Sequence, residues 1–446
     1  MLQRLIPRGV RVLELGCGHG DVLAALDPGV GVGVDVSPKM IAEARRRHPG
    51  LRFEVGDAER LDLDGETFDY VVLCDLVGEL HDVWAALRSL RRVCSPRTRL
   101  VITYSNFLWE PALRLATRLG VRRAQYLQNW FATADILNLL HLNGFEAVMT
   151  GDRLSLPFQV PVVAEIANHV VGSLPFVHHL NLIEYVVARP APSFDVVADN
   201  LSTSVVVPAK NERGNIRQII RRVPRMGPRT ELIFVEGGSS DGTRAEIEAA
   251  MLDEPSPCVL SCVPQHGKGK GDAVRAGFAT ATGDILMILD ADLTVAAEDL
   301  PRFYLAIAER RADFVNGCRL IYPLEDQAMR FLNRHANKTF SILLSYALSQ
   351  KVKDTLCGTK VLRRHDYQRI VENRTMFGDF DPFGDFDLLF GAAHLGLRIA
   401  EMPVRYFART YGETQIDRFR HGLLLLRMFG VATKHFKLSR SSRRRG

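Results

Sequence analysis

The sequence lacks the features that mark several other classes of protein. No uncharged apolar run approaches the length of about 18 residues that a membrane-spanning helix needs, and the best runs, 340–348 and 422–426, are far shorter. The first residues, MLQRLIPRGVRVLEL, lack the layout of a signal peptide. The cysteines are odd in number and are not spaced as zinc-binding pairs, which favours free thiols in a reducing cytoplasm. They are Cys17, Cys74, Cys94, Cys258, Cys262, Cys318 and Cys357.

Acidic residues are missing from the end of the chain. Asp417 is the last of them, and nine basic residues follow it in a chain whose net charge is +6. Residues 422–446 predict an amphipathic helix with a basic end, which fits either an interfacial helix on an anionic membrane or a helix packed on its own domain. Nucleic-acid binding is disfavoured, because no recognised nucleic-acid-binding module accompanies the charge.

What is present is typical of a globular protein with more than one domain. The chain has 446 residues, of which 47% are hydrophobic and 24% charged, and a prior of roughly 150 residues per domain predicts two or three domains. Two openings of strand, glycine turn and helix, RVLELGCGHG at 11 and TSVVVPAKNERGN at 203, each begin an alternation of strands and helices. This alternation predicts an α/β fold with a parallel sheet, covered on both faces, in each half.

The composition along the chain predicts four segments. We expect a first domain at 1–189, a Pro- and Asp-containing linker at 190–202, a second domain at 203–421 and the basic tail at 422–446. The predicted strands are 11–15, 30–35, 51–55, 69–74, 99–104 and 182–188 in the first half, and 203–207, 231–235, 258–262, 284–289 and 313–316 in the second.

The turn after the first strand carries three glycines, Gly16, Gly18 and Gly20. Glycine lets the backbone turn sharply and approach a ligand, and the following helix N-terminus offers free N–H groups. Asp35 ends the next strand, where a carboxylate can accept hydrogen bonds from both ribose hydroxyls. Asp57 follows a third strand, where it can accept a hydrogen bond from an adenine amino group. These motifs, in this order, predict a nucleoside-binding site.

The segments LELGCGHG, GVDVS, GDAERLDL and FDYVVLCD resemble those of the class I S-adenosylmethionine-dependent methyltransferases over about residues 8–190. The resemblance implies a Rossmann-like sheet with S-adenosylmethionine as cofactor, Glu14 and the three glycines near its methionine end, Asp35 on the ribose and Asp57 on the adenine. Acceptor contacts are expected after the fourth strand, around Asp75. Related enzymes carry helices before the glycine strand, whereas ten residues precede it here. A plain nucleotide-binding domain and a cofactor-binding domain without turnover are the alternatives.

An apolar strand in the second half, ILMIL at 285–289, ends in Asp290 and Asp292. Side chains two residues apart on an extended chain point the same way, so both carboxylates can face one hard divalent cation. Two unpaired like charges beside an apolar strand are costly, and a metal removes that cost. The pair therefore predicts an Mg²⁺ or Mn²⁺ site, with a solvated strand end as the alternative.

Six motifs in order resemble the family-two glycosyltransferases of the GT-A fold, and most closely the dolichol-phosphate mannosyltransferase-like branch, over about residues 203–421. They are VPAKNE at 207, FVEGGSSDGT at 234, HGKGKGDA at 266, ILMILDAD at 285, DTLCGTK at 354 and RTYGET at 409. The resemblance implies a GT-A nucleotide-sugar-binding fold. It implies catalytic roles for Asp290, Asp292, Arg409 and Asp385, with the first two as metal ligands. It implies that the nucleotide sugar is bound by Pro208, Ala209, Asn211, Glu212, Glu236, Lys268, Asp272 and Arg319.

Two positions depart from that family's pattern. Glu236 and Gly237 stand where the second-strand motif usually begins with an Asp pair, which puts nucleobase or ribose recognition in doubt. Gln415 stands where the mannosyltransferases usually have Lys, which removes a positive charge from the expected phosphate clamp.

The implied reaction is inverting transfer of a hexose from a nucleotide sugar, GDP-mannose or a UDP-hexose, to a polyprenyl phosphate or a related lipid or glycan hydroxyl. A phosphate monoester has a second pKa of about 6 and attacks without a base at neutral pH. A hydroxyl acceptor would need a base, for which Asp385 and Asp387 are the candidates. We expect a bifunctional bacterial enzyme, cytoplasmic and peripheral on the inner face of the membrane. The alternative that is not an enzyme is a membrane-associated protein that binds a nucleotide sugar without catalysis.

Overall fold

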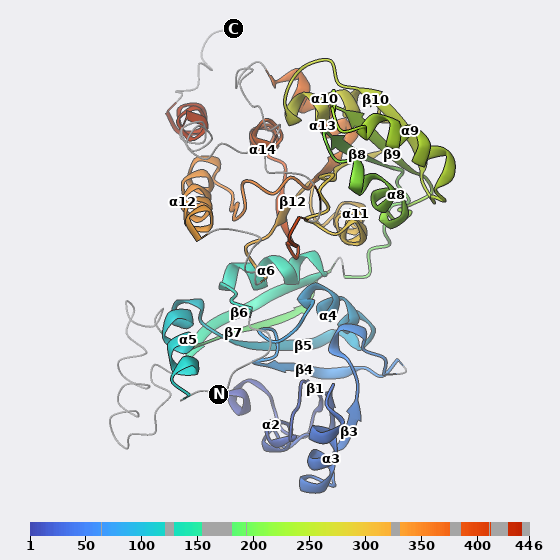
Figure 1. Cartoon of the computed structure of the whole chain (residues 1–446). Coiled ribbons are helices and arrows are strands. Elements are labelled where there is room, and N and C mark those ends of the chain that lie inside the picture. The colour runs from blue at the N-terminus through green and yellow to red at the C-terminus, as the bar shows by residue number, and fades with distance from the viewer. Residues whose placement is uncertain are drawn as a thin grey trace. The chain divides into compact units, whose positions relative to one another are not determined.

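The computed structural model describes residues 1–63, 65–120, 129–153, 181–192, 194–322, 331–374, 385–409, 411 and 427–438, with backbone alone at 331–339, 385 and 438. The chain forms two compact units, Met1–Val196 and Val197–Gly446 (Figure 1). Each unit is an α/β structure on a seven-stranded sheet. Within the described residues, no helix is both long and apolar enough to span a bilayer.

The first sheet has the strand order β3-β2-β1-β4-β5-β7-β6. Its strands are β1 (Arg11–Leu15), β2 (Val30–Asp35), β3 (Arg52–Val55), β4 (Phe68–Cys74), β5 (Cys94–Ser105), β6 (Phe145–Arg153) and β7 (Ile183–Pro190). The first five strands are parallel, but β7 runs antiparallel to both β5 and β6. The predicted all-parallel sheet is therefore wrong at this edge, because hydrophobic periodicity reports which side chains are buried and not the direction of a strand.

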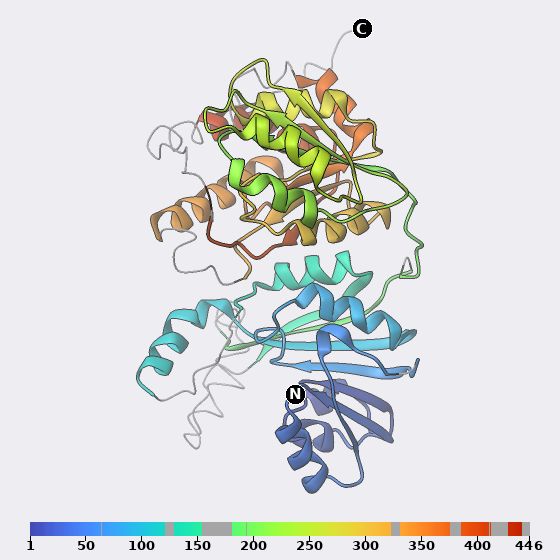
Figure 2. The same cartoon turned by 45° about the vertical axis from the view of Figure 1, so that its right-hand side comes forward.

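Helices cover both faces of the first sheet. They are α1 (Leu2–Leu5), α2 (Asp21–Ala25), α3 (Pro38–Arg47), α4 (Val83–Ser89), α5 (Glu110–Arg118) and α6 (Thr133–Leu142). Side chains of α1, α2 and α3 share one apolar cluster with inward residues of the strands. Helices α4 and α6 contact each other on the opposite side of the sheet (Figure 2). Asp82 begins α4 as its cap, since its Oδ1 accepts a hydrogen bond of 3.0 Å from the Ala85 N–H.

The second sheet has the order β10-β9-β8-β11-β13-β12-β14. Its strands are β8 (Thr203–Ala209), β9 (Thr230–Glu236), β10 (Val259–Pro264), β11 (Ile285–Ile288), β12 (Phe314–Cys318), β13 (Lys360–Arg363) and β14 (Ile399–Pro403). Strands β10, β9, β8 and β11 are parallel, whereas β13 is antiparallel to its neighbours β11 and β12. This sheet is also mixed, and the sequence pattern predicts neither β13 nor β14, which are four and five residues long.

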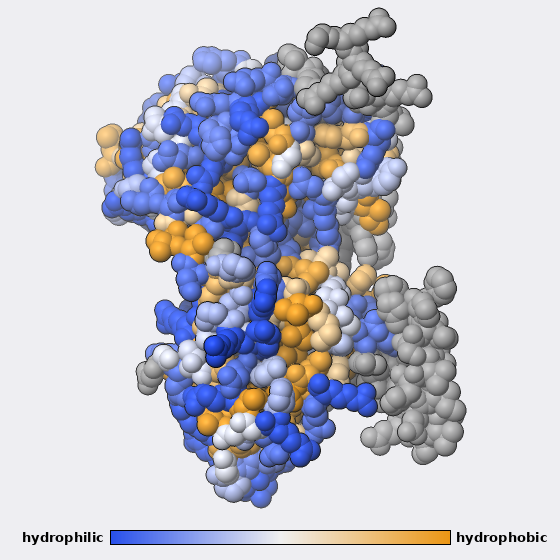
Figure 3. Space-filling view, turned by 180° about the vertical axis from the view of Figure 1, so that it is seen from behind, coloured by the Kyte–Doolittle hydropathy of each residue, from blue (hydrophilic) through white to orange (hydrophobic). Residues whose placement is uncertain are grey.

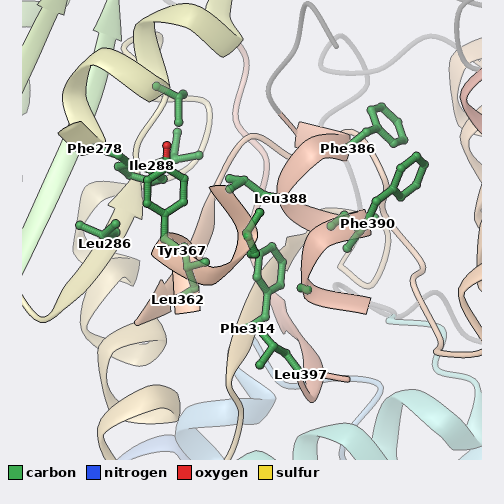
Figure 4. Packing of buried hydrophobic residues seen from close by; sticks show 14 of the residues in the cluster. Phe278, Leu286, Ile288, Phe314, Leu362, Tyr367, Phe386, Leu388, Phe390 and Leu397 are labelled. Atoms are coloured by element: carbon green, nitrogen blue, oxygen red, sulfur yellow. The ribbon is translucent and has the colours of Figure 1, made fainter. Parts of the chain in front are cut away.

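The helices of the second unit pack on both faces of its sheet. They are α8 (Ile216–Arg222), α9 (Thr243–Asp253), α10 (Lys270–Thr280), α11 (Leu300–Ala308), α12 (Phe331–Leu348), α13 (Arg364–Glu372) and α14 (Asp385–His394). One apolar core joins α10, α12, α13 and α14 to the sheet, and Figure 4 shows its centre. Hydrophilic residues dominate the face of this unit seen in Figure 3, with small hydrophobic groups among them.

Both sheets reverse their winding direction at one point. In the first sheet the chain leaves β1 towards β2 and β3 and then returns to add β4 on the other side. In the second sheet it leaves β8 towards β9 and β10 and then returns to add β11. Crossovers leave such a pair of strands in opposite directions, so a crevice opens outside their carboxyl ends. The topology therefore places a binding site at the ends of β1 and β4 and another at the ends of β8 and β11.

The segment predicted as a linker makes contacts at both of its ends. Phe194 is buried and packs edge-on against Phe145, with 5.1 Å between the ring centroids. Asp199 accepts hydrogen bonds from the guanidinium groups of Arg310 and Arg363 in the second unit.

The described part of the basic tail, 427–438, is helical and has a buried side. Met428 and Ala432 are four residues apart, are 2% and 0% exposed, and belong to the same core as α12 and α14. Of the two interpretations that the sequence left open, packing on its own domain holds for these residues. Residues 412–426 and 439–446 lie outside the described part of the chain.

We expect Met428→Ala to lower the free energy of unfolding of the second unit by about 2–4 kcal/mol, because it opens a cavity in a closed core. The three tryptophans, Trp84, Trp109 and Trp130, all lie in the first unit. Urea unfolding followed by circular dichroism should therefore show a transition at lower urea, while the transition in tryptophan fluorescence stays in place.

The matched control is Lys434→Ala on the exposed side of the same helix, which should change stability by no more than about 0.5 kcal/mol. Equal effects of the two substitutions would contradict the packing of this helix.

Candidate functional sites

The carboxyl ends of β8 and β11 are neighbours in the second sheet, since Ile288 pairs with Val206. Residues that the sequence predicts for the donor follow directly on β8, and Asp290 and Asp292 follow on β11. The topology thus brings together two motifs that are about eighty residues apart in the chain.

Each carboxylate of the pair is matched by a cationic side chain. Lys270 Nζ forms an ion pair with Asp290 Oδ1. An Arg409 terminal nitrogen donates to Asp292 Oδ2 at 2.6 Å, and the Thr294 hydroxyl donates to Asp292 Oδ1 at 2.8 Å. Lys270 and Arg409 therefore offset the repulsion that was predicted between the two carboxylates at the end of this apolar strand.

Lys270 is a site residue that the sequence reasoning missed. The loop HGKGKG offers two lysines, and the prediction chose Lys268, which is exposed. Lys270 instead begins α10 and reaches Asp290. The signal for it was its place as the first residue of the helix, where the helix direction fixes the backbone, whereas Lys268 lies in the preceding turn. Asp272 closes this turn, since its Oδ2 accepts a hydrogen bond of 2.8 Å from the Gly267 N–H.

Arg409 reaches the site on a segment that crosses over the end of β11. The Phe407 N–H donates to the Thr294 carbonyl at 2.9 Å, and Tyr406 forms an antiparallel bridge with Val295. From there Arg409 contacts Asp292 and lies 3.6 Å from Glu212 Oε1. This guanidinium therefore links the loop after β8 to the loop after β11.

The pKa values of these acids are shifted in opposite directions. Burial raises the pKa of Glu212 to about 6, and hydrogen bonding by Asn215 and the charge of Arg409 oppose that rise. Burial also disfavours the charged form of Asp290, but Lys270, with smaller contributions from Lys360 and Arg319, holds its pKa below the ordinary value. Asp290 is thus held as a carboxylate, whereas Glu212 titrates near neutral pH.

Gly358, from the DTLCGTK motif, closes the other side of the Asp290 carboxylate. A Cβ at this position would collide with the Asp290 carboxylate and with Lys270 Nζ. The backbone of this segment therefore lies so close to the ion pair that no Cβ fits between them, which explains the glycine at this position.

The departure at Glu236 and Gly237 lies where β9 ends. Burial works against the charge of Glu236, but hydrogen bonds from the N–H groups of Ser239 and Gly238 outweigh it and lower its pKa. Its Oε1 accepts from the Ser239 N–H at 2.7 Å. A Cβ on Gly237 would lie 2.9 Å from Gln265 Oε1, so the flexible Gln265 side chain would have to move to admit an aspartate at this position.

Two further residues that were predicted to bind the nucleotide sugar form hydrogen bonds between loops. The Asn211 backbone is left-handed, with φ 58°, and its side-chain Oδ1 accepts from the Ser240 N–H at 2.9 Å. Arg319 forms a two-pronged ion pair with the buried Asp354, at 2.7 and 2.8 Å. Their roles in donor binding stay predictions. Pro208 and Ala209 lie at the end of β8 as predicted.

Asp385 begins α14, but its side chain lies outside the described residues, as do Thr410 and 412–414. Its neighbour Asp387 accepts a hydrogen bond of 2.6 Å from Arg374 Nε, and this ion pair joins the two sides of the segment 375–384. Asp387 is thus committed to a structural contact, which does not favour it as a general base.

The first unit carries its predicted residues at the carboxyl ends of β1 and β2. Gly16, Gly18 and Gly20 all have positive φ, which L side chains rarely adopt, so the turn requires glycine. Asp35 ends β2, and its two carboxylate oxygens accept from the Gly18 N–H at 2.9 Å and the Ser37 N–H at 2.8 Å. Asp57 is exposed and caps the short helix η1 (Ala58–Arg60) through a hydrogen bond of 2.9 Å from the Glu59 N–H.

Glu14 is the most perturbed acid of this unit. It is 2% exposed, and burial raises its pKa to about 8, although a hydrogen bond from the Leu23 backbone opposes the rise. Its Oε2 has no hydrogen-bond partner among the described residues. A buried carboxyl oxygen without a donor fits a site that is completed by a positively charged ligand.

An open pocket of about 350 Å³ lies beside the end of β4. Asp75 and Thr103 line it with Leu2 of α1, Val22 of α2 and Leu26, which follows α2, and these three are aliphatic. The predicted acceptor side, after the fourth strand, thus adjoins a mostly apolar pocket.

Comparison with known proteins matches a different domain family to each half of the chain. The family model for glycosyl transferase family 2 matches residues 204–371, and that for a methyltransferase domain matches residues 12–97. The chain combines a methyltransferase domain with a family-two glycosyltransferase domain.

Among curated relatives, the undecaprenyl-phosphate 4-deoxy-4-formamido-L-arabinose transferase of Shewanella sediminis (strain HAW-EB3) is 30% identical over 216 residues, which are 48% of this chain and 61% of the relative. The protein of that name from Enterobacter sp. (strain 638) is 26% identical over 223 residues, 49% of this chain and 63% of the relative. The chain thus spans less than two thirds of the length of either relative.

Among solved structures, an S-adenosylmethionine-dependent methyltransferase from Mesorhizobium loti is 20% identical to the part of this chain that it matches, with a TM-score of 0.34. The match covers 42% of this chain and 95% of that chain.

We expect Gly358→Ala to weaken binding of a nucleotide sugar to the glycosyltransferase domain by roughly tenfold or more, because the added Cβ displaces Asp290 and Lys270. Thermal stabilisation by donor and Mn²⁺ measures the loss. Gly430→Ala is the control, since a Cβ there meets nothing within 4 Å and should leave binding unchanged. Unaltered donor binding in Gly358→Ala would show that this close approach is not needed.

Proposed function

We propose that the glycosyltransferase domain transfers a sugar from a nucleotide sugar to a polyprenyl phosphate. The observation that carries this proposal is the set of opposed charges at the ends of β8 and β11, in which Asp290 and Asp292 each contact a cation. Carboxylates suit a metal-bound diphosphate, and the cations suit phosphate oxygens. The names of the curated relatives, which are undecaprenyl-phosphate transferases, support the acceptor class.

Asp290 and Asp292 would hold Mg²⁺ or Mn²⁺. Within the described residues no group of three or more His, Cys, Asp or Glu side chains could hold a metal by itself. Two carboxylates completed by substrate phosphates are, however, a common way to bind Mg²⁺. A bound ion of this kind offsets the charge that develops on a departing diphosphate. Lys270 and Arg409, which contact the same carboxylates, would turn to phosphate oxygens when a donor binds.

A phosphate acceptor fits the site better than a hydroxyl acceptor does. A phosphate monoester is ionised at neutral pH and needs no base. Of the two candidate bases, Asp387 is engaged by Arg374, and the side chain of Asp385 lies outside the described residues. Arg409 supplies a cation beside Asp292 for an anionic acceptor or for the donor. We propose inverting transfer of a hexose, with GDP-mannose or a UDP-hexose as donor.

We further propose that the methyltransferase domain binds S-adenosylmethionine and methylates a product of the same pathway. Three features support this: the glycine turn, Asp35 at the end of β2 and the unpaired Oε2 of the buried Glu14. The cofactor supplies an electrophilic methyl group and a positive charge. Asp35 would hold the ribose, and Glu14 would face the charged methionine end. A cofactor-binding domain without turnover is the second candidate, favoured by the exposure of Asp57.

We place the protein in the cytoplasm, peripheral to the inner face of the membrane, because its proposed donor is a soluble nucleotide and its proposed acceptor is a lipid.

For the glycosyltransferase domain, we expect slow, Mn²⁺-dependent hydrolysis of one donor in a panel of nucleotide sugars, and loss of at least about a hundredfold in Asp292→Asn. Release of free sugar, measured with and without a chelator, tests this. Asp253→Asn, an exposed aspartate on α9, is the control and should keep full activity. Full metal-dependent hydrolysis in Asp292→Asn would disprove the assignment of this site.

For the methyltransferase domain, we expect affinity for S-adenosylmethionine to rise with pH between about 6 and 8. The pKa of Glu14 is raised to about 8, so a cationic ligand binds the ionised form and releases a proton. Below that pKa the linkage amounts to up to about tenfold in affinity per pH unit. Calorimetric titrations in buffers of different ionisation enthalpy measure the proton released.

Glu14→Gln should remove this proton release. Asp27→Asn, a surface change in the same unit, should leave it as it is in the unchanged protein. Equal proton release in Glu14→Gln would show that Glu14 does not face the cofactor charge.

A further inference from the structure

The exposed side of the tail helix is basic. In helical residues 427–438 the buried side is formed by Met428 and Ala432, and Arg427, Lys434 and Lys437 are exposed. Residues 427–433 are α-helical and Lys434–Leu438 form a turn of π-helix, and the three exposed cations lie on the side away from the two buried side chains. No acidic residue occurs in this segment, so nothing within it offsets the charge.

Helix α12 presents apolar side chains beside the end of the tail helix that carries Lys437. Ile342 and Tyr346 are each 65% exposed, and they are one helical turn apart, so they share a face of α12. The tail helix and α12 are in contact (Figure 1). Lys437 joins them directly, since its Nζ lies 5.0 Å from the centre of the Tyr346 ring and donates to Ser349 Oγ at 2.7 Å.

These five residues, Ile342, Tyr346, Arg427, Lys434 and Lys437, form what we call the basic–apolar face. It combines an aliphatic side chain, a tyrosine with a polar tip and three cations on long flexible stems. That combination matches the boundary of a bilayer, where aliphatic groups enter the acyl region, tyrosine lies at headgroup depth and lysine reaches the phosphates. A nucleic acid would use the cations and the ring, but it has no site for the exposed isoleucine.

We propose that the basic–apolar face docks the glycosyltransferase domain on an anionic lipid bilayer. The proposal rests on the proposed function only in that a polyprenyl phosphate acceptor lies in such a bilayer. It differs from an interfacial tail helix, because the described part of the tail buries its apolar side in the protein, and α12 supplies the apolar contacts. In this arrangement the cations of the tail helix contact lipid phosphates, and the apolar side chains of α12 enter the bilayer.

The test is flotation of the purified full chain with vesicles of phosphatidylcholine, with and without phosphatidylglycerol. We expect binding to the anionic vesicles that falls with salt. Each neutralised lysine near an anionic surface is worth roughly fivefold in partitioning. Lys434→Glu with Lys437→Glu should therefore lower the partition coefficient by roughly 25-fold or more. Ile342→Ser with Tyr346→Ser should lower it at every salt concentration, because apolar contacts are not screened.

The control variants are Arg244→Glu and Leu252→Ser on α9, where the arginine side chain is 66% exposed and the leucine is 89% exposed. Arg244→Glu reverses one charge and Leu252→Ser removes one exposed apolar side chain, and both variants should float like the unchanged protein. Donor hydrolysis without vesicles should stay normal in all these variants. If the unchanged protein does not hydrolyse any donor, the proposed function is refuted. The flotation result still tests membrane docking, because it does not depend on hydrolysis.

Two results would overturn the proposal. Equal flotation of the two lysine substitutions and the Arg244→Glu control would show that bilayer contact lies elsewhere. Binding of a short single-stranded oligonucleotide that depends on the same lysines, with no vesicle flotation, would assign the face to nucleic acid.

Discussion

Two like charges at the end of a buried strand are the constraint on which the glycosyltransferase domain depends. Asp290 and Asp292 follow β11, whose four residues are all buried. Each carboxylate therefore needs a positive charge close to it. Lys270 comes from the start of α10, and Arg409 from the segment after β14. The two cations therefore tie distant parts of the second unit to one point, and Gly358 closes against that point because it has no side chain.

The two domains place their candidate sites in the same way. Each sheet reverses its winding beside the strand that carries the first motif, β1 in one and β8 in the other. At such a point neighbouring connections diverge, and the carboxyl ends of two strands are left open to a ligand. The chemistry then differs. The methyltransferase domain places the buried, uncompensated Glu14 there, whereas the glycosyltransferase domain places compensated carboxylates.

Much of the fold follows from hydrophobic patterns, and the exceptions share one cause. Most of the predicted strands lie close to their observed bounds because each is an apolar run between glycine-rich or polar turns, although β5 begins at Cys94, five residues before its predicted start. Strands β6, β13 and β14 were not predicted, since each contains charged residues and none is an uninterrupted apolar run. The ion pair of Lys270 with Asp290 was not predicted either, because spacing along a loop does not say which lysine reaches a given carboxylate, and the expected role of Lys268 in donor binding stays a prediction.

The sequence alone determined the two α/β halves, the glycine turn of the first and the carboxylate pair of the second. These are local features, since a turn that needs positive φ needs glycine, and residues two apart on a strand point the same way. Only the tertiary structure decided which cations meet that pair, that Arg319 is engaged by Asp354 and that the tail helix turns Met428 inward. Charges and apolar side chains find partners through space, and that choice is made by the packing of the whole domain.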